Sequence, residues 1–152
     1  MNTGKIFEED FKKSVPSNFF YYRFIDGTSS WGGSSAARFQ AKNICDCMVY
    51  TGSKLYLFEL KSHKGKSLPF SCVRSNQIDG LLLARKSNIG CYIVVTFPEV
   101  EKTFMVDIQK FKDYMDTTTR KSIPINWLEE NCITIKQTIK KIRYKYDLTI
   151  LS

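Results

Sequence analysis

Two neighbouring stretches of the chain, residues 44–50 and 54–61, are short and mostly hydrophobic, with Asp46, Glu59 and Lys61 as polar positions within them. Short hydrophobic runs next to turn residues predict β-strands, in which successive side chains point to opposite faces. The three residues between the stretches, Thr-Gly-Ser at 51–53, are typical of a tight turn. The pattern therefore predicts a β-hairpin near the middle of the sequence.

The turn determines how the two strands of this hairpin face each other. If it contains two residues, Thr51 pairs with Lys54, and counting back places Asp46 directly opposite Glu59. Because side chains alternate along a strand, Lys61 points to the same face as Glu59. The hairpin is therefore expected to bring two carboxylates and one ammonium group together.

The rest of the pattern predicts a mixed α/β layer. We expect one helix capped by Thr3 and a second capped by Ser75. The predicted elements are helices at 3–14, 75–86 and 109–115, and strands at 19–25, 90–97 and 103–108. Residues 26–37 are rich in glycine and serine and form a loop or a projecting arm. Residues 133–142 suit either a helix or strands, whereas residues 144–150 alternate like a strand.

Two carboxylates that face each other across a strand pair repel and destabilise the sheet. They become favourable when a divalent cation lies between them, because Mg²⁺ prefers hard oxygen ligands. A simpler interpretation places Asp46 at a sheet edge and treats Glu59 and Lys61 as a solvated strand face. The hydrophobic neighbours of Glu59 favour the metal site, since a solvated face does not require them.

Size and charge narrow the classes of function. A chain of 152 residues with 43% hydrophobic residues is expected to form one domain, residues 1–152. Its net charge of +8 favours a polyanionic partner, either nucleic acid or an anionic membrane. No stretch has the length of a transmembrane helix, and the first ten residues hold no signal core. We therefore expect a cytoplasmic protein with no membrane partner.

The five cysteines do not form a paired framework. A zinc site made of Cys45, Cys47, His63 and Cys72 is conceivable, although this spacing matches no familiar zinc pattern. Reduced cysteines in a reducing compartment are the simpler account, with Cys45 and Cys47 pointing away from Asp46 into the core.

Four segments resemble the RecU-type Holliday junction resolvases, which belong to the restriction-endonuclease-like PD-(D/E)xK nucleases. They are Gly-Lys-Ile-Phe-Glu-Glu-Asp at 4–10, the hairpin at 46–61, Leu-Pro-Phe to Asn-Gln-Ile at 68–78, and a late basic segment at 120–130. The chain is similar to a short, phage-type member. The resemblance implies an α/β restriction-endonuclease-like fold with a mixed central sheet flanked by helices.

The resemblance also implies a metal-dependent endonuclease that resolves four-way DNA junctions in recombination and repair. Asp46, Glu59 and Gln77 would hold Mg²⁺ or Mn²⁺, Lys61 would act on the attacking water, and Glu8 would close the site from the first helix. Two symmetric nicks require two active sites, so a homodimer is expected.

Basic residues flank this site and suit contacts with DNA phosphates. They are Arg38 and Lys42 before the hairpin, Lys64 and Lys66 after it, and Arg74 before the Gln77 helix. Solvated side chains explain any one of them, but the cluster favours DNA binding.

The chain departs from the family at Ile44, where a threonine proposed to contact the metal is found in the family. The region before Asp46 is also shorter, so the arm at 27–42 is expected to be reduced. Two other functions stay open: a restriction-like nuclease acting on other DNA structures, and a non-catalytic DNA-binding protein that modulates recombination.

Overall fold

The computed structural model describes residues 2–25 and 42–152 and is built around a six-stranded sheet of order β1-β2-β3-β5-β6-β8. These strands are β1 (Phe20–Arg23), β2 (Cys47–Tyr50), β3 (Leu55–Ser62), β5 (Gly90–Phe97), β6 (Lys102–Asp107) and β8 (Ile133–Thr134). Strand β3 runs parallel to β5, and the other neighbours are antiparallel. The sheet is mixed, as predicted.

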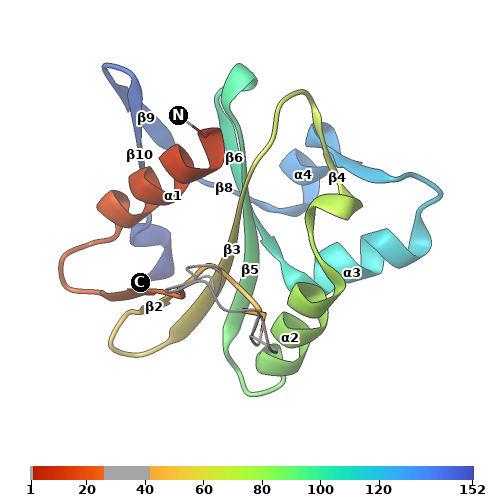
Figure 1. Ribbon diagram of the computed structural model, residues 1–152, viewed down its shortest axis with the longest axis horizontal. Coiled ribbons are helices and arrows are strands. Elements are labelled where there is room, and N and C mark those ends of the chain that lie inside the picture. Colours follow the sequence, from red (N-terminus) through yellow and green to blue (C-terminus); the bar gives the residue numbers. More distant parts are fainter. Residues whose placement is uncertain (1, 26–41) are drawn as a thin grey trace, which may run out of the picture.

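Helices cover both faces of this sheet, which Figure 1 shows nearly edge-on. One face carries α1 (Thr3–Ser14) and a two-stranded hairpin of β9 (Gln137–Lys140) and β10 (Arg143–Tyr146). The other carries α2 (Ser75–Arg85), α3 (Ile108–Thr117) and α4 (Ile125–Asn131). Two short strands, β4 (Ser67–Pro69) and β7 (Ser122–Pro124), pair beside α4. Single 3₁₀ turns lie at Phe70–Cys72, Pro98–Val100 and Thr149–Leu151.

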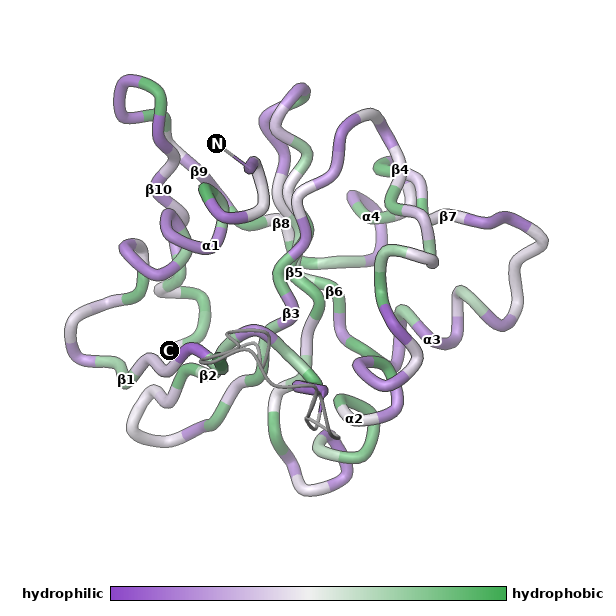
Figure 2. Tube along the Cα trace, viewed as in Figure 1, coloured by the Kyte–Doolittle hydropathy of each residue, from purple (hydrophilic) through white to green (hydrophobic). Residues whose placement is uncertain are grey.

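Each face of the sheet has its own hydrophobic core. Under α1, Phe11 is fully buried and packs edge-on against Phe58, with ring centroids 5.4 Å apart. On the opposite face, Leu81 of α2 and Phe111 of α3 are fully buried. Strand β5 contributes to both cores, and Figure 2 shows it as hydrophobic along most of its length. A central strand buried on both faces carries such a nearly continuous hydrophobic run.

From Tyr50 back to Cys47, the register of the β2–β3 hairpin agrees with the prediction. Tyr50 pairs with Leu55 and Cys47 pairs with Phe58, and the Thr51 amide donates to the Lys54 carbonyl at 3.0 Å. The regular register ends at Cys47, because the Asp46 amide also donates to the carbonyl of Phe58, at 3.0 Å. Contrary to the prediction, Asp46 is therefore not paired directly with Glu59, but its Oδ2 accepts from the amide of the next residue, Leu60.

The start of the first strand was predicted wrongly. Strand β2 begins at Cys47 rather than at residue 44, and residues 44–46 form an irregular lead-in. As a result, Cys45 and Cys47 do not share a face: Cys45 packs in the core under α2, and Cys47 in the core under α1. Both are buried, as expected.

Both predicted helix caps were displaced by one residue. Asn2, not Thr3, caps α1, with its side chain accepting from the Gly4 amide at 2.9 Å. Arg74, not Ser75, is the N-cap residue of α2. The Asn2 side chain serves as a helix cap as well as that of threonine.

The tail forms strands rather than a helix, since β8, β9 and β10 all lie between Ile133 and Tyr146. A single 3₁₀ turn follows, so the predicted strand at 144–150 is shorter than expected. Helix α4 and the β4–β7 pair were not predicted. None of the helices in the described ranges, 2–25 and 42–152, is long and apolar enough to cross a membrane.

Candidate active site

Asp46 is held in place by backbone contacts on both sides. Its amide donates to the Phe58 carbonyl at 3.0 Å, and its carbonyl accepts from the Phe24 amide at 2.9 Å. Its side chain turns toward β3, where Oδ2 accepts from the Leu60 amide at 2.7 Å. This bond fixes the carboxylate of Asp46 beside the residue that follows Glu59.

Glu59 is almost completely buried, with 1% of its surface exposed. Its Oε1 lies 2.6 Å from Nζ of Lys61. Its Oε2 is also buried and has no hydrogen-bond partner among the described residues. A buried carboxylate oxygen without a partner is costly, so a positive ligand at this position would stabilise the site.

Burial raises the pKa of Glu59 above its usual value of 4.5. The Lys61 ammonium acts in the opposite direction, followed by weaker effects of the Gln77 amide and the Arg74 guanidinium. A carboxyl group that burial makes hard to ionise, next to a fixed cation, is typical of functional sites.

The side chains of β3 alternate between the two faces of the sheet, as predicted. Tyr56, Phe58 and Leu60 belong to the core under α1. Leu57 lies in the opposite core. Lys61, on the same side as Glu59, keeps 22% of its side chain exposed, so its ammonium lies between the buried carboxylate and solvent.

Helix α2 brings Gln77 to the site. Its side chain is buried, and its Oε1 accepts from the Arg74 amide at 3.0 Å, which caps the start of the helix. The carbonyl oxygen expected to face a metal is therefore already bonded to the backbone. The side-chain amide of Gln77 lowers the pKa of Glu59, so the residue lies beside Glu59.

Ile44, the position that departs from the family pattern, has a packing role. A Cβ atom added at Gly80 would lie 2.2 Å from Cγ2 of Ile44 and 2.7 Å from its Cβ. Helix α2 and the segment that leads to Asp46 thus approach each other as closely as the missing side chain of Gly80 permits.

Glu8 lies on α1 and forms an ion pair of 2.6 Å with Arg23 of β1. No group of three or more His, Cys, Asp or Glu side chains within the described ranges is arranged to hold a metal, so Glu8 does not form such a group with Asp46 and Glu59. Arg23 was not anticipated. The only signal was its position as the one charged residue in the aromatic stretch 19–25.

The zinc site is excluded for the four residues considered. His63 Nδ1 lies 4.0 Å from Sγ of Cys72, but Cys45 and Cys47 point into separate cores. Burial raises the pKa of Cys45 to about 12, which keeps its thiol protonated. All five cysteines are free thiols.

Four of the predicted DNA-contacting residues are described by the structure, and all four are exposed. Lys42 is exposed in the segment before Asp46, and Lys64 and Lys66 are exposed after β3. Arg74 is exposed at the start of α2 and lies close enough to lower the pKa of Glu59. Arg38 and the arm at 27–41 lie outside the described residues.

A family model and one curated relative point to the same family. The family model for Recombination protein U, RecU, matches residues 11–149. The SPbeta prophage-derived uncharacterized protein YotM of Bacillus subtilis (strain 168) is 32% identical over 167 residues, which cover 99% of this chain and 85% of that protein. The Holliday junction resolvase RecU of Ureaplasma parvum is 25% identical over 99 residues, 59% of this chain and 58% of that protein.

A solved structure shares the fold. It is Hjc, a Holliday junction resolvase of Archaeoglobus fulgidus, with a TM-score of 0.56 over 86% of this chain and 95% of that chain. At 18% identity, the likeness shows the restriction-endonuclease-like architecture and carries no residue roles.

Proposed function

The chain belongs to the RecU family of recombination proteins, and we propose that it is a metal-dependent endonuclease that resolves four-way DNA junctions. The Ureaplasma relative and the structural neighbour are both described as Holliday junction resolvases, which supports junctions as the substrate. The whole chain acts as a single nuclease domain, with the arm at 27–42 as an accessory.

The observation that carries this proposal is the environment of Glu59. One of its oxygens is bonded to Lys61, and the other is buried without a partner among the described residues, one residue before the Leu60 amide that holds the Asp46 carboxylate. A divalent cation would satisfy the unpaired oxygen and the charges of both carboxylates. Mg²⁺ commonly binds proteins through one or two carboxylates, with water and substrate phosphate as its other ligands.

Asp46 and Glu59 would hold Mg²⁺, or Mn²⁺ in its place, with Gln77 beside them. The bound ion would polarise the scissile phosphate and make water a stronger nucleophile. The hydrogen bond from the Leu60 amide keeps Asp46 in position for this role without the help of solvent. Glu59 is removed from water, which would strengthen its electrostatic interaction with a bound cation.

Lys61 would orient the attacking water and offset the charge that develops on the phosphate. Its ammonium reaches solvent from a fixed contact with Glu59, so it stands at the edge where DNA would approach. Glu8 would close the active site from α1, and its ion pair with Arg23 would hold its carboxylate in place.

Five basic residues would contact phosphates on either side of the cut without reading the sequence: Arg38, Lys42, Lys64, Lys66 and Arg74. A junction is cut at two symmetric positions, so the active form would be a homodimer with one site in each subunit.

Cleavage of a synthetic four-way junction, compared with a linear duplex of the same sequence, tests this function. With Mg²⁺ the protein should nick the junction in opposed strands and leave the duplex intact, and EDTA should stop the reaction. Equal cutting of both substrates would indicate a less selective nuclease. Tight junction binding with no nicking in Mg²⁺ or Mn²⁺ would indicate a non-catalytic protein.

A further inference from the structure

A second basic site lies on the other face of the sheet. A cavity of about 690 Å³ opens between the end of α1 and the β9–β10 hairpin. Three lysines from separate segments line it, Lys13 of α1, Lys136 before β9 and Lys145 of β10. We call this cavity, defined by these three residues, the lysine hollow.

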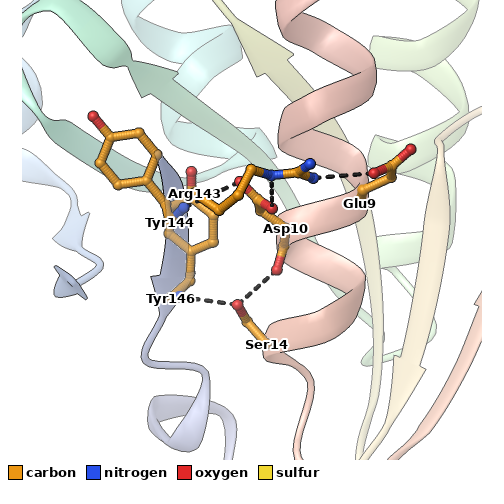
Figure 3. Close-up of polar contacts among 6 residues, drawn as sticks. All are labelled: Glu9, Asp10, Ser14, Arg143, Tyr144 and Tyr146. Atoms are coloured by element: carbon orange, nitrogen blue, oxygen red, sulfur yellow. Dashed lines mark hydrogen bonds and ion pairs between the residues drawn. The ribbon is translucent and has the colours of Figure 1, made fainter. Parts of the chain in front are cut away.

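The hairpin next to the lysine hollow is fastened to α1 by the contacts drawn in Figure 3. The guanidinium of Arg143 lies 2.8 Å from Asp10 and 3.0 Å from Glu9. The backbone amides of Tyr144 and Tyr146 donate to Asp10 Oδ2 at 3.2 Å and to Ser14 Oγ at 2.9 Å. Asp10 is 2% exposed, so the bonds to Asp10 are largely shielded from water, whereas the Arg143–Glu9 ion pair is exposed. The buried bonds hold this side of the lysine hollow in a fixed shape.

The charge of the lysine hollow is positive. All three lysines are exposed, and the acidic residue among those lining it, Asp147, faces them. Hydrogen bonds from Thr149 lower the pKa of Asp147, and Lys136 and Lys145 add to the effect, so this carboxylate is ionised at neutral pH. Three ammonium groups against one carboxylate leave a net charge of two, which a bound anion would neutralise.

Lys13 alone has a simpler explanation, because a cation at the end of a helix interacts favourably with the helix dipole. That explanation does not extend to Lys136 and Lys145, which lie outside α1. The charge is also concentrated in this part of the chain. Residues 131–146 contain five basic residues and no acidic one, in a protein of net charge +8.

We propose that the lysine hollow binds the sugar–phosphate backbone of a junction arm, as a second DNA contact separate from the Asp46–Glu59 site. This inference rests on the proposed function, since it assigns a further surface to the same substrate. The hydroxyl group of Thr138 also lines the hollow and can donate to a phosphate oxygen. The carboxylates of the candidate site lie on the α2 side of the sheet, so the hollow would hold DNA away from the cleaved bond.

Salt-dependent binding of a fluorescently labelled four-way junction in EDTA tests the proposal. The test variant replaces Lys13, Lys136 and Lys145 with glutamine. The control replaces three exposed lysines elsewhere, Lys54, Lys86 and Lys110, and therefore changes the net charge equally. Thermal melting of each variant verifies that it folds.

The test variant should bind the junction more weakly than the control between about 50 mM and about 200 mM salt. The slope of log affinity against log salt should also become shallower by about 1 for each phosphate that the variant no longer binds. The inference is overturned if the two variants share the same affinity and slope while the wild type binds normally. If the wild type does not bind junctions at all, the proposed function fails first.

Discussion

Glu59 combines features that stable proteins avoid. Its carboxylate is removed from water, one oxygen has no partner among the described residues, and burial raises its pKa. Lys61 compensates for only part of this cost. Such a residue is retained when function requires it, because a well-packed neutral side chain would make the fold more stable.

The first prediction concerns stability. Since the folded-state pKa of Glu59 is raised, its contribution to stability is present below the unfolded-state pKa and is lost as pH rises through the folded-state pKa. Glu59→Gln removes the charge and keeps the shape, so metal-free protein should melt a few degrees higher at pH 7. About 1 kcal/mol corresponds to about 2–4 °C in a chain of this size.

The difference should shrink as the pH is lowered toward 4.5, where wild-type Glu59 becomes protonated as well. Glu101→Gln, at an exposed position, is the matched control and should leave the melting temperature unchanged at both pH values. A Glu59→Gln variant that melts lower than the wild type at pH 7 would contradict the account.

A second prediction concerns Lys61, whose charge lowers the pKa of Glu59. Lys61→Gln should reduce single-turnover cleavage by about 10²–10⁴-fold, the usual contribution of a proton-transfer group. It should also move the acidic limb of the pH–rate profile to higher pH, since Glu59 becomes harder to ionise. Lys86→Gln should change neither the cleavage rate nor the pH–rate profile. If Lys61 has only a structural role, its replacement should leave the acidic limb of the profile at the wild-type pH.

Among the elements, the β2–β3 hairpin and its contact with α2 determine the site. The hairpin brings the Asp46 carboxylate to the Leu60 amide, next to Glu59, and α2 adds Gln77 and Arg74 at its first turn. Gly80, one turn further along α2, is where the helix approaches the segment before Asp46.

Gly80→Ala should therefore displace this segment. Overpacking of this kind costs about 1–3 kcal/mol, against about 1 kcal/mol gained from the better helix propensity of alanine. We expect lower stability in urea unfolding and a larger loss of cleavage. The double variant with Ile44→Ala should recover both, whereas Gly4→Ala, whose nearest neighbour would be 3.4 Å away, should have little effect. Additive losses in the double variant would show that the contact is not the cause.

The sequence predicts those elements whose structure depends on neighbouring residues better than those that depend on contacts far along the chain. The hairpin register and strand β5 follow from a turn and from hydrophobic runs that are complete within a few residues. The irregular segment before Cys47 does not follow from the local sequence, because it depends on packing of Ile44 against Gly80, far along the chain. The tail was ambiguous for the same reason, since β10 is fixed by Asp10 and Ser14 of α1.

The candidate site was predictable to a similar degree. Asp46, Glu59 and Lys61 are linked by strand alternation and one turn, so their proximity could be read from the sequence. The ion pair of Glu8 with Arg23 could not be predicted, because it joins two separate elements, α1 and β1. The bond of Gln77 to the Arg74 amide is local, but it removes the oxygen that was expected to face a metal.

At the scale of the whole molecule, the sheet separates two functional surfaces. The α2 side holds the carboxylates and the predicted catalytic lysine, and the α1 side holds the lysine hollow. DNA that contacts both surfaces would be positioned by one and cut at the other, which suits a branched substrate with arms in several directions.

The most direct measurement is single-turnover cleavage of a four-way junction in Mg²⁺ by Asp46→Asn and Glu59→Gln, with junction binding measured in parallel. Both substitutions keep the size of the side chain, and asparagine can still accept from the Leu60 amide. Each variant should cut the junction about a thousandfold or more slowly than the wild type and still bind it, while Glu101→Gln should cut at the normal rate. Cleavage at the wild-type rate by either variant would show that these two carboxylates do not form the active site.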